Sequence, residues 1–418
     1  MPLRLFRCSL ACLTAASAAF AFTAVTASAD ESKDGFDDND GIHASSAKFG
    51  GASPVEDAHT VRHWSGQTTN PKDGVTYRYN MVGVDPSSGR SATIGVDIIA
   101  VDITVGEASF NGTENVQALL ASPIFQQGDY STTSAATNAR GGQGGGGGLS
   151  AGNSGVQLLD ATMRAQFNKV GTGYHLFLAP KVRPPITINV PNTTVPPVLG
   201  TTLTRNGITY ADLDNDWFKS TLQDQVHSLH LNPSRLALFL TTNVVLFHDQ
   251  NPLHCCVIGS HGADDLPTAT SDSEDPDDGH QKVHTFVWSS WLTAGFLPLW
   301  AIQDIHGVSH EIVEWATNPF VNNIVQAYRS PLAPPTAACS NMLETGDPVT
   351  GIGFALSVGG RTYHPEDEVL LPWFMRTAPN TTSQPGQDPA KNPNVGRYTF
   401  MGDLNPFWSR FNHPPGTC

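Results

Sequence analysis

The segment SHEIVEWATNPF limits most strongly what this chain can fold into. It contains the pattern H-E-x-x-E, formed by His310, Glu311 and Glu314. Positions i and i+4 of a helix lie on one face, so His310 and Glu314 could bind one metal ion together. Glu311 lies beside them and could act as a base. The segment therefore predicts a helix that carries a metal site and ends at Asn318-Pro319, because a residue before proline avoids the helical region.

Apolar residues around this motif predict the rest of the helix. They recur at spacings of 4, 3, 4 and 3, which defines a buried face made of Ala301, Ile305, Val308, Ile312 and Trp315. We expect the helix to begin near Ala301, with His306, His310 and Glu314 on a different face. The pattern is that of an H-E-x-x-H zinc peptidase helix in which glutamate replaces the second histidine.

A hydrolytic zinc site needs three protein ligands and one open position. Half of the ten glutamates fall between Glu311 and Glu368, which favours a site in this region. The segment CSNMLETGDPVTG offers Glu344 as the third ligand and Asp347 as an alternative ligand or as a support for the ligands. Two carboxylates and one imidazole would acidify a bound water less than two imidazoles do.

Other residues are weaker candidates for the site. His306 could be the third ligand, and the loop residue His261 in GSHGA could reach the pocket. His364 or Tyr363 could stabilise an oxyanion. Three adjacent acidic residues are most simply a solvated run of charges: Glu366, Asp367 and Glu368.

The N-terminal residues have the features of a secretory signal. Residues 1–29 combine Arg4 and Arg7, an apolar stretch and an A-x-A cleavage site, so we expect an exported protein, either extracellular or periplasmic. Residues 30–70 are expected to be a disordered acidic leader. Residues 71–418 are expected to form a single domain, with a flexible Gly-rich loop at 140–152.

Charge and cysteine content narrow the possible partners. Removing Arg4 and Arg7 changes the net charge from −15 to −17, which argues against nucleic acid and anionic membranes as partners. No segment after the signal is apolar enough to span a membrane. The acidic stretch 264–280 suggests calcium only weakly, because the EF-hand spacing is absent. Four cysteines remain, and we expect Cys255 and Cys256 to pair outward with Cys339 and Cys418, because adjacent cysteines rarely bridge.

Strand patterns predict a mixed sheet. The run RLALFLTTNVVLF (235–247) is nearly continuous in apolar residues, as expected for a buried central strand. In SATIGVDIIAVDITV the alternation changes phase between Ile98 and Val101, which suggests a β-bulge. Amphipathic helices are expected near 156–167 and 213–229. The fold class is therefore α+β, with a mixed sheet packed against the H-E-x-x-E helix.

The order LALFLTTNVVLF, CCVIGSHGA, SHEIVEWATNPFVN and ETGD resembles the plant phosphate-induced, EXORDIUM-like secreted proteins. It is closer still to bacterial secreted proteins with the same helix. The resemblance implies a zincin-like fold and an extracellular setting, and it selects the motif residues with Glu344, Asp347 and His261. The chain departs from the plant pattern before His261 and after Asp347, so the disulfide pattern of that family does not transfer.

These patterns predict a secreted, zinc-dependent, peptidase-like hydrolase in which Glu311 activates water. The alternative is an extracellular or cell-wall-associated binding protein that uses the metal as a structural element. A closed site with both Glu344 and Asp347 bound would favour the alternative, whereas an open position beside a cleft would favour the enzyme.

Overall fold

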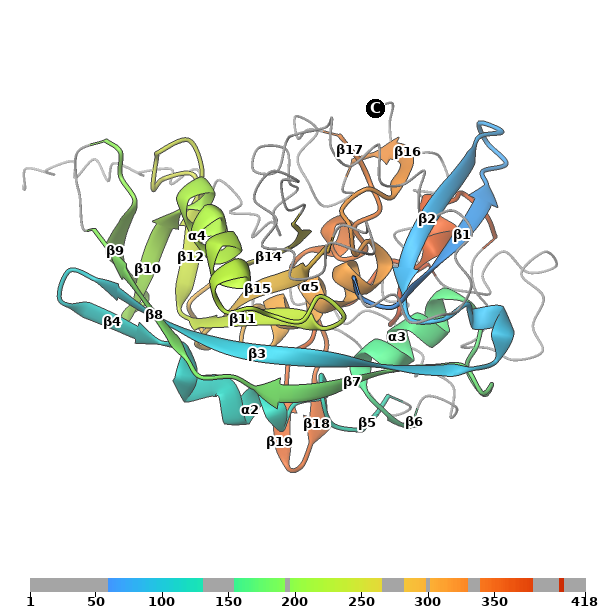
Figure 1. Cartoon of the computed structure of the whole chain (residues 1–418), viewed down its shortest axis with the longest axis horizontal. Helices are drawn as coiled ribbons and strands as arrows, with labels where there is room; N and C mark the ends of the chain where they lie inside the picture. Colours follow the sequence, from blue (N-terminus) through green and yellow to red (C-terminus); the bar gives the residue numbers. More distant parts are fainter. Residues whose placement is uncertain are drawn as a thin grey trace, which may run out of the picture.

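The computed structural model describes residues 59–130, 154–191, 196–264, 282–297, 301–329, 339–378 and 398–401. The expected signal peptide, most of the acidic leader and the Gly-rich loop lie outside these residues. The described chain is an α+β structure with several β-sheets and few helices (Figure 1). Among the described residues, no helix is both long and apolar enough to cross a membrane.

Ordered structure begins earlier than the sequence predicts. Strand β1, His63–Thr69, occupies the end of the segment expected to be a disordered leader, and it pairs antiparallel with β2, Thr76–Val82. Trp64 of β1 packs edge-on against Tyr79 and Phe167. The contact with Tyr79 lies within the hairpin, whereas the contact with Phe167 holds the hairpin against the rest of the chain. The acidic composition of the leader indicates neither contact.

The largest sheet has seven strands and is mixed. Its order is β14-β15-β11-β3-β4, and β7 and β8 also pair with β3. Strand β3 pairs in parallel with β7, β8 and β11, and β11 pairs in parallel with β15. The two antiparallel pairs are β14 with β15 and β4 with β3. The strands are β3 Ser91–Val105, β4 Ala108–Asn111, β7 His175–Val182, β8 Ile186–Val190, β11 Leu236–Thr242, β14 Gly259–Ala263 and β15 Thr285–Trp291.

Strand β3 runs along most of the molecule (Figure 1) and contains no bulge. The predicted bulge is therefore wrong. Ile94, Val96 and Ile98 enter one hydrophobic core, whereas Val101 and Ile103 enter a second core on the other face. The phase of burial changes because the strand covers different cores at its two ends, while the side chains keep alternating between faces.

The apolar run 235–247 forms two strands and not one. β11 lies inside the seven-stranded sheet as predicted, but β12, Val244–Phe247, belongs to a four-stranded sheet of order β13-β12-β10-β9. Asn243 separates them with φ of 51°, a backbone region that asparagine tolerates better than most residues. The other strands of this sheet are β9 Gly200–Arg205, β10 Ile208–Asp214 and β13 Cys255–Val257.

Helices cover both faces of the large sheet. α3, Leu158–Gln166, and α5, His306–Thr317, bury apolar side chains in the first core, and α4, Asn215–Ser228, does so in the second. The short helices are α2 Val116–Leu120 and α6 Leu371–Phe374, with 3-10 turns at Pro86–Ser88, Gly112–Asn115 and Asp347–Val349. Small two-stranded sheets pair β5 Gly128–Asp129 with β6 Ser154–Val156, β16 Ile324–Tyr328 with β17 Ser340–Met342, and β18 Leu356–Val358 with β19 Arg361–Tyr363.

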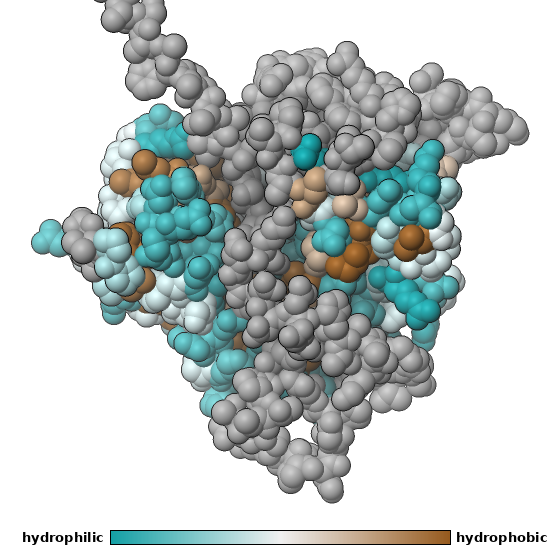
Figure 2. Space-filling view, turned by 90° about the horizontal axis from the view of Figure 1, so that it is seen from above, coloured by the Kyte–Doolittle hydropathy of each residue, from teal (hydrophilic) through white to brown (hydrophobic). Residues whose placement is uncertain are grey.

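Hydrophilic residues cover much of the described surface in Figure 2, where hydrophobic residues form only small areas. The most exposed large hydrophobic side chain among the described residues is Leu253, at 90%. Scattered exposed side chains of this kind are normal for a folded protein and do not by themselves mark an interface.

The sharp turn between the two sheets provides a test of the fold. The Asn243 side chain accepts a hydrogen bond from the backbone N–H of Thr293 at 2.9 Å and donates to its hydroxyl at 3.0 Å. We expect Asn243→Ala to lower the free energy of unfolding by about 2 kcal/mol, through lost hydrogen bonds and an unfavourable φ. Asn243→Gly should lower the free energy of unfolding less, because glycine adopts a positive φ without strain. Urea denaturation measures both, and an alanine variant as stable as wild type would contradict this account.

Candidate metal centre

Helix α5 carries the H-E-x-x-E motif and is buried along its whole length. It begins at His306, so the expected start near Ala301 is wrong. Asp304 has φ of 43° and its backbone N–H donates to the carbonyl of Leu292, directly after β15, which keeps the preceding residues out of the helix. The predicted end is confirmed, because Asn318 caps the helix. Because every residue of α5 is buried, its polar face is as buried as its apolar face.

His310 and Glu314 lie side by side, as their spacing predicts. Their Nε2 and Oε2 atoms are 3.1 Å apart but are not aligned for a hydrogen bond. The other carboxylate oxygen, Oε1, accepts hydrogen bonds from the backbone N–H groups of Gly346 at 2.8 Å and Asp347 at 3.1 Å. These two amides orient Glu314 and leave Oε2 directed toward the histidine.

Glu366 is a residue of this site that the sequence interpretation missed. Its Oε2 lies 2.7 Å from Nδ1 of His310, and its Oε1 accepts a hydrogen bond from the backbone N–H of Gly351 at 2.8 Å. The expected solvated run of charges is wrong, because Glu366, Asp367 and Glu368 are at most 2% exposed. In the neutral ring, an Nδ1–H that donates to Glu366 leaves the lone pair of His310 on Nε2, an arrangement common to metal-binding histidines.

His261 and Glu344 form the other half of the cluster. His261 projects from β14, with Nδ1 3.3 Å from Oε2 of Glu311 and Nε2 3.5 Å from Oε2 of Glu344. Glu344 accepts a hydrogen bond from Nδ2 of Asn318 at 2.8 Å through Oε1. The residue that ends α5 therefore also positions a carboxylate, a second role that its capping position alone does not reveal.

Two glycines allow these segments to approach α5 closely. A Cβ atom at Gly259 of β14 would lie 2.6 Å from Cγ and Oε1 of Glu311, and one at Gly346 would overlap the ring of His310. Any other residue at these positions would displace the neighbouring motif side chain. The close approach therefore depends on the absence of a Cβ atom.

The buried charges of the cluster are strongly unbalanced. Burial raises the pKa of Glu311, raises that of Glu344 well above its usual range and raises that of Glu366 to about 7. Burial acts in the same direction on Glu314, but the charge of His310 outweighs it and the pKa of Glu314 falls. Acidic side chains outnumber the neighbouring imidazoles: Glu311, Glu314, Glu344, Asp347, Glu366 and Glu368 surround His261, His306 and His310. A bound cation would offset this excess of negative charge.

Two overlapping sets of side chains could hold a metal ion, and Glu314 belongs to both. One set is His310, Glu314 and Asp347, and the other is His261, Glu314 and Glu344. The predicted trio of His310, Glu314 and Glu344 is thus divided between them.

The spacing of these atoms fits a metal. Ligands about 2.1 Å from a tetrahedral zinc ion lie about 3.4 Å from one another. The separation is 3.1 Å for His310 and Glu314, 3.7 Å for His310 and Asp347, and 3.5 Å for His261 and Glu344. Nε2 of His310, Nε2 of His261 and Oε2 of Glu344 make no hydrogen bond although they are buried. Buried nitrogen and oxygen atoms that make no hydrogen bond are suited to bind a cation.

The remaining candidates lie beside the cluster or outside it. His306 is buried with Nε2 3.4 Å from Glu366, and burial, aided by the charge of His310, lowers its pKa to about 3, so it is neutral. Nδ1 of His364 lies 2.7 Å from Asp304. The hydroxyl of Tyr363 donates to the carbonyl of Ala118. None of the three belongs to a metal-ligand set of the described chain. Of the acidic stretch 264–280, which suggested calcium only weakly, Asp264 alone belongs to the described residues.

Lys219 is a buried lysine that the sequence interpretation did not single out. It lies in α4 and is only 3% exposed. Burial lowers its pKa to about 8, and the charge of Glu311 opposes this effect.

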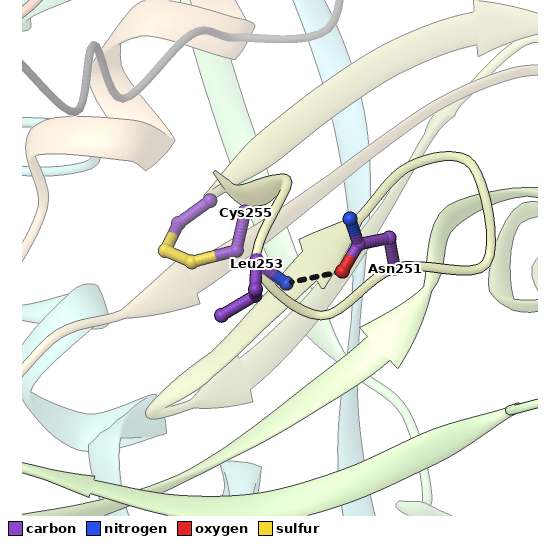
Figure 3. The surroundings of a disulfide bond; sticks show 4 residues. Asn251, Leu253 and Cys255 are labelled. Carbon is purple, nitrogen blue, oxygen red and sulfur yellow. Dashed lines mark hydrogen bonds between the residues drawn. A yellow bond between two sulfur atoms is a disulfide. The ribbon is translucent and has the colours of Figure 1, made fainter. Parts of the chain in front are cut away.

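The disulfide arrangement differs from the expected outward pairing. Cys255 and Cys256 are bonded to each other (Figure 3). The expected outward pairing, which rested on the rarity of bridges between adjacent cysteines, is therefore wrong for this pair. Cys339 is also disulfide-bonded, and Cys418 lies outside the described residues. In Figure 3 the side chain of Asn251 supports the loop by accepting a hydrogen bond from the backbone N–H of Leu253.

Comparison with known proteins adds no assignment to this geometry. No protein-family model matches the chain, and neither curated proteins nor solved structures give a significant match. A functional assignment therefore depends on the contacts within the cluster.

The shared position of Glu314 predicts the effect of its removal. Glu314→Gln keeps the acceptor for the two backbone amides but removes the negative charge, so we expect the loss of one zinc equivalent per chain. His310→Ala should have the same effect, whereas His306→Ala should retain the zinc. Elemental analysis after dialysis against dilute zinc measures the ratio. A Glu314→Gln protein that keeps its full zinc content would refute the site.

The contact between His310 and Glu366 predicts a smaller effect. Glu366→Gln should weaken zinc binding by about 10- to 100-fold, the usual result of removing a carboxylate behind a metal-binding histidine. Glu368→Gln is the matched control, because Glu368 is buried in the same segment and has no bond to His310. Competition with a chromophoric chelator measures both affinities, and equal losses in the two variants would contradict the role of Glu366.

Proposed function

We propose that the protein is a secreted, zinc-dependent hydrolase of the peptidase type, with Glu311 as its general base. The observation that carries the proposal is the position of Glu311. It belongs to neither set of metal-ligand candidates, yet its carboxylate lies 3.3 Å from His261 and 4.0 Å from Nε2 of His310. A carboxylate beside a metal site that is not itself a ligand is what this chemistry requires of its base.

The environment of Glu311 supports this role. Burial raises its pKa, which makes the carboxylate a better proton acceptor than an exposed glutamate. Nδ1 of His261 lies within hydrogen-bond distance of Oε2, so it can orient the carboxylate. Gly259 leaves room for Oε1, which is free of this contact.

Each residue then has a defined task. His310, Glu314 and one or more of His261, Glu344 and Asp347 would hold the zinc ion. Such an ion lowers the pKa of water and polarises a carbonyl group. Glu311 accepts a proton from the attacking water and transfers it to the leaving amine. Glu366 holds the ring of His310, and Asn318 holds Glu344.

The proposal includes the cellular setting and the zincin-like fold. Residues 1–29 have the sequence features of a signal peptide, which supports export. The resemblance to EXORDIUM-like proteins supports an extracellular or cell-wall substrate, and a peptide is the first class to test. The packing of α5 against β14 and β15 of a mixed sheet is compatible with the zincin-like arrangement.

A structural role for the metal is the second candidate, and one observation favours it. The side chains of His261, His310, Glu314, Glu344 and Asp347 are at most 9% exposed, and both downstream carboxylates lie near ligand atoms. A fully ligated, buried ion would bind the segments together without reacting with a substrate.

Glu311→Gln distinguishes the two functions. The amide keeps the shape of the side chain but cannot accept the proton of water, so we expect zinc to be retained and hydrolysis to fall by about 10²- to 10⁴-fold. Digestion of a peptide library, with zinc stoichiometry measured on the same samples, tests both effects.

One control variant and two possible outcomes make the result decisive. Glu107→Gln changes an exposed glutamate and should leave both readouts unchanged. Full zinc content without cleavage in wild type would favour the structural role. Cleavage that persists in Glu311→Gln would refute the proposed base even in an active peptidase.

A further inference from the structure

A second group of potential metal ligands shares no residue with the cluster around Glu314. It consists of His227 in α4, Asp264 directly after β14 and His284 directly before β15. Oδ2 of Asp264 lies 3.3 Å from Nε2 of His227 and 3.3 Å from Nδ1 of His284. Both distances are close to the separation of about 3.4 Å expected between ligands of a tetrahedral zinc ion.

The hydrogen bonds of His284 fix which nitrogen is available. Its Nε2 lies 3.0 Å from the carbonyl oxygen of Leu231, which can only accept a hydrogen bond, so Nε2 carries the proton. In the neutral ring Nδ1 then has a lone pair, and this lone pair faces Asp264. A backbone carbonyl that holds the distal N–H is the usual support of a metal-binding histidine.

The carboxylate of Asp264 is positioned in a comparable way. Its Oδ1 accepts a hydrogen bond of 2.6 Å from the backbone N–H of His284, and its own N–H donates to the carbonyl of His284. Oδ2 of Asp264 and Nδ1 of His284 are buried and make no hydrogen bond, although they face each other. Asp264 is 5% exposed and His284 is 7% exposed. Two acceptors held together in this way repel each other unless a cation lies between them.

His227 completes the group and gives access to it. Its side chain is 36% exposed, whereas that of Asp264 is 4% exposed, so the third ligand lies at the protein surface. Two imidazoles and one carboxylate select zinc and similar transition ions, whereas calcium and magnesium prefer oxygen ligands.

We propose that His227, Asp264 and His284 form a second zinc site, which connects α4 to the ends of β14 and β15. The contact between Asp264 and His284 already joins residues 20 positions apart in the sequence. A bound ion adds the last turn of α4 to this junction. The role is structural, because the group includes, among the residues that the structure describes, no acidic side chain beyond its own ligand candidate.

The experiment measures zinc binding to the full mature chain after removal of metal by a chelator. Calorimetric titration with zinc should give two equivalents for wild type, one for Glu314→Gln, one for His227→Ala, and none for the double variant. Zinc should raise the melting temperature of Glu314→Gln but not that of the double variant, because binding to the native state stabilises it. Asp264→Asn, which keeps the acceptor Oδ1, should match His227→Ala.

The matched control is His254→Ala. His254 lies 3.2 Å from Asp249 in an exposed pair that belongs to no ligand group of the described residues, so its loss should not change the zinc stoichiometry. A double variant that binds as much zinc as Glu314→Gln would overturn the second site, as would a Glu314→Gln protein that binds none. A Glu314→Gln protein that binds no zinc would mean that a proton, and not a metal ion, lies between Asp264 and His284. If Glu314→Gln binds as wild type does and His227→Ala removes all zinc, the first site fails and the second stands.

Discussion

The polar face of α5 is the constraint on which the rest of the site depends. A helix that buries His310, Glu311 and Glu314 must find partners for them, because an unpaired buried charge is destabilising by several kcal/mol. The chain provides them from distant segments: two backbone amides at 346 and 347, a carboxylate at Glu366 and an imidazole at His261. Each partner fixes the orientation of a motif side chain, so the requirements of burial also produce the geometry of the site.

The same constraint explains the backbone around the helix. Gly259 and Gly346 lie where a side chain would overlap Glu311 or His310, so the segments that provide partners can approach α5 closely. Asn318 ends the helix, holds Glu344 through Nδ2, and accepts hydrogen bonds from the next turn through Oδ1. The end of the helix and the site are therefore built from the same contacts. A substitution at one of these positions affects folding and ligand geometry together.

The two candidate zinc sites differ in their surroundings. Around Glu314 an excess of acidic side chains includes Glu311, which is not a ligand candidate and is available to move a proton. At the second site the backbone N–H of His284 holds Asp264, and the carbonyl of Leu231 holds the ring of His284. The first site is suited to chemistry and the second to joining α4 to the sheet. Both follow the same rule, in which the distal nitrogen of a histidine is occupied so that the proximal nitrogen is available to a metal.

Sequence periodicity predicted the structure correctly where the decisive contact is between residues close in the sequence. The spacing of four residues placed His310 beside Glu314, and Asn318-Pro319 ended the helix where predicted. The mixed sheet and the buried strand β11 also follow from apolar patterns. The start of α5 and the phase change in β3 did not follow, because they depend on which neighbouring strand or core each residue meets.

Only the tertiary structure determined the partners that lie far apart in the sequence. Glu366 is 56 residues from His310, and its charged neighbours in sequence gave it the pattern of a solvated segment. His261 and Glu344 meet because β14 and the segment after β17 both pack against α5, which no local spacing encodes. The sequence by itself therefore determined a helix with an adjacent pair of candidate metal ligands. The packing of distant segments decided which carboxylates and imidazoles complete the site, because burial brings together charges whose separation along the chain carries no periodic signal.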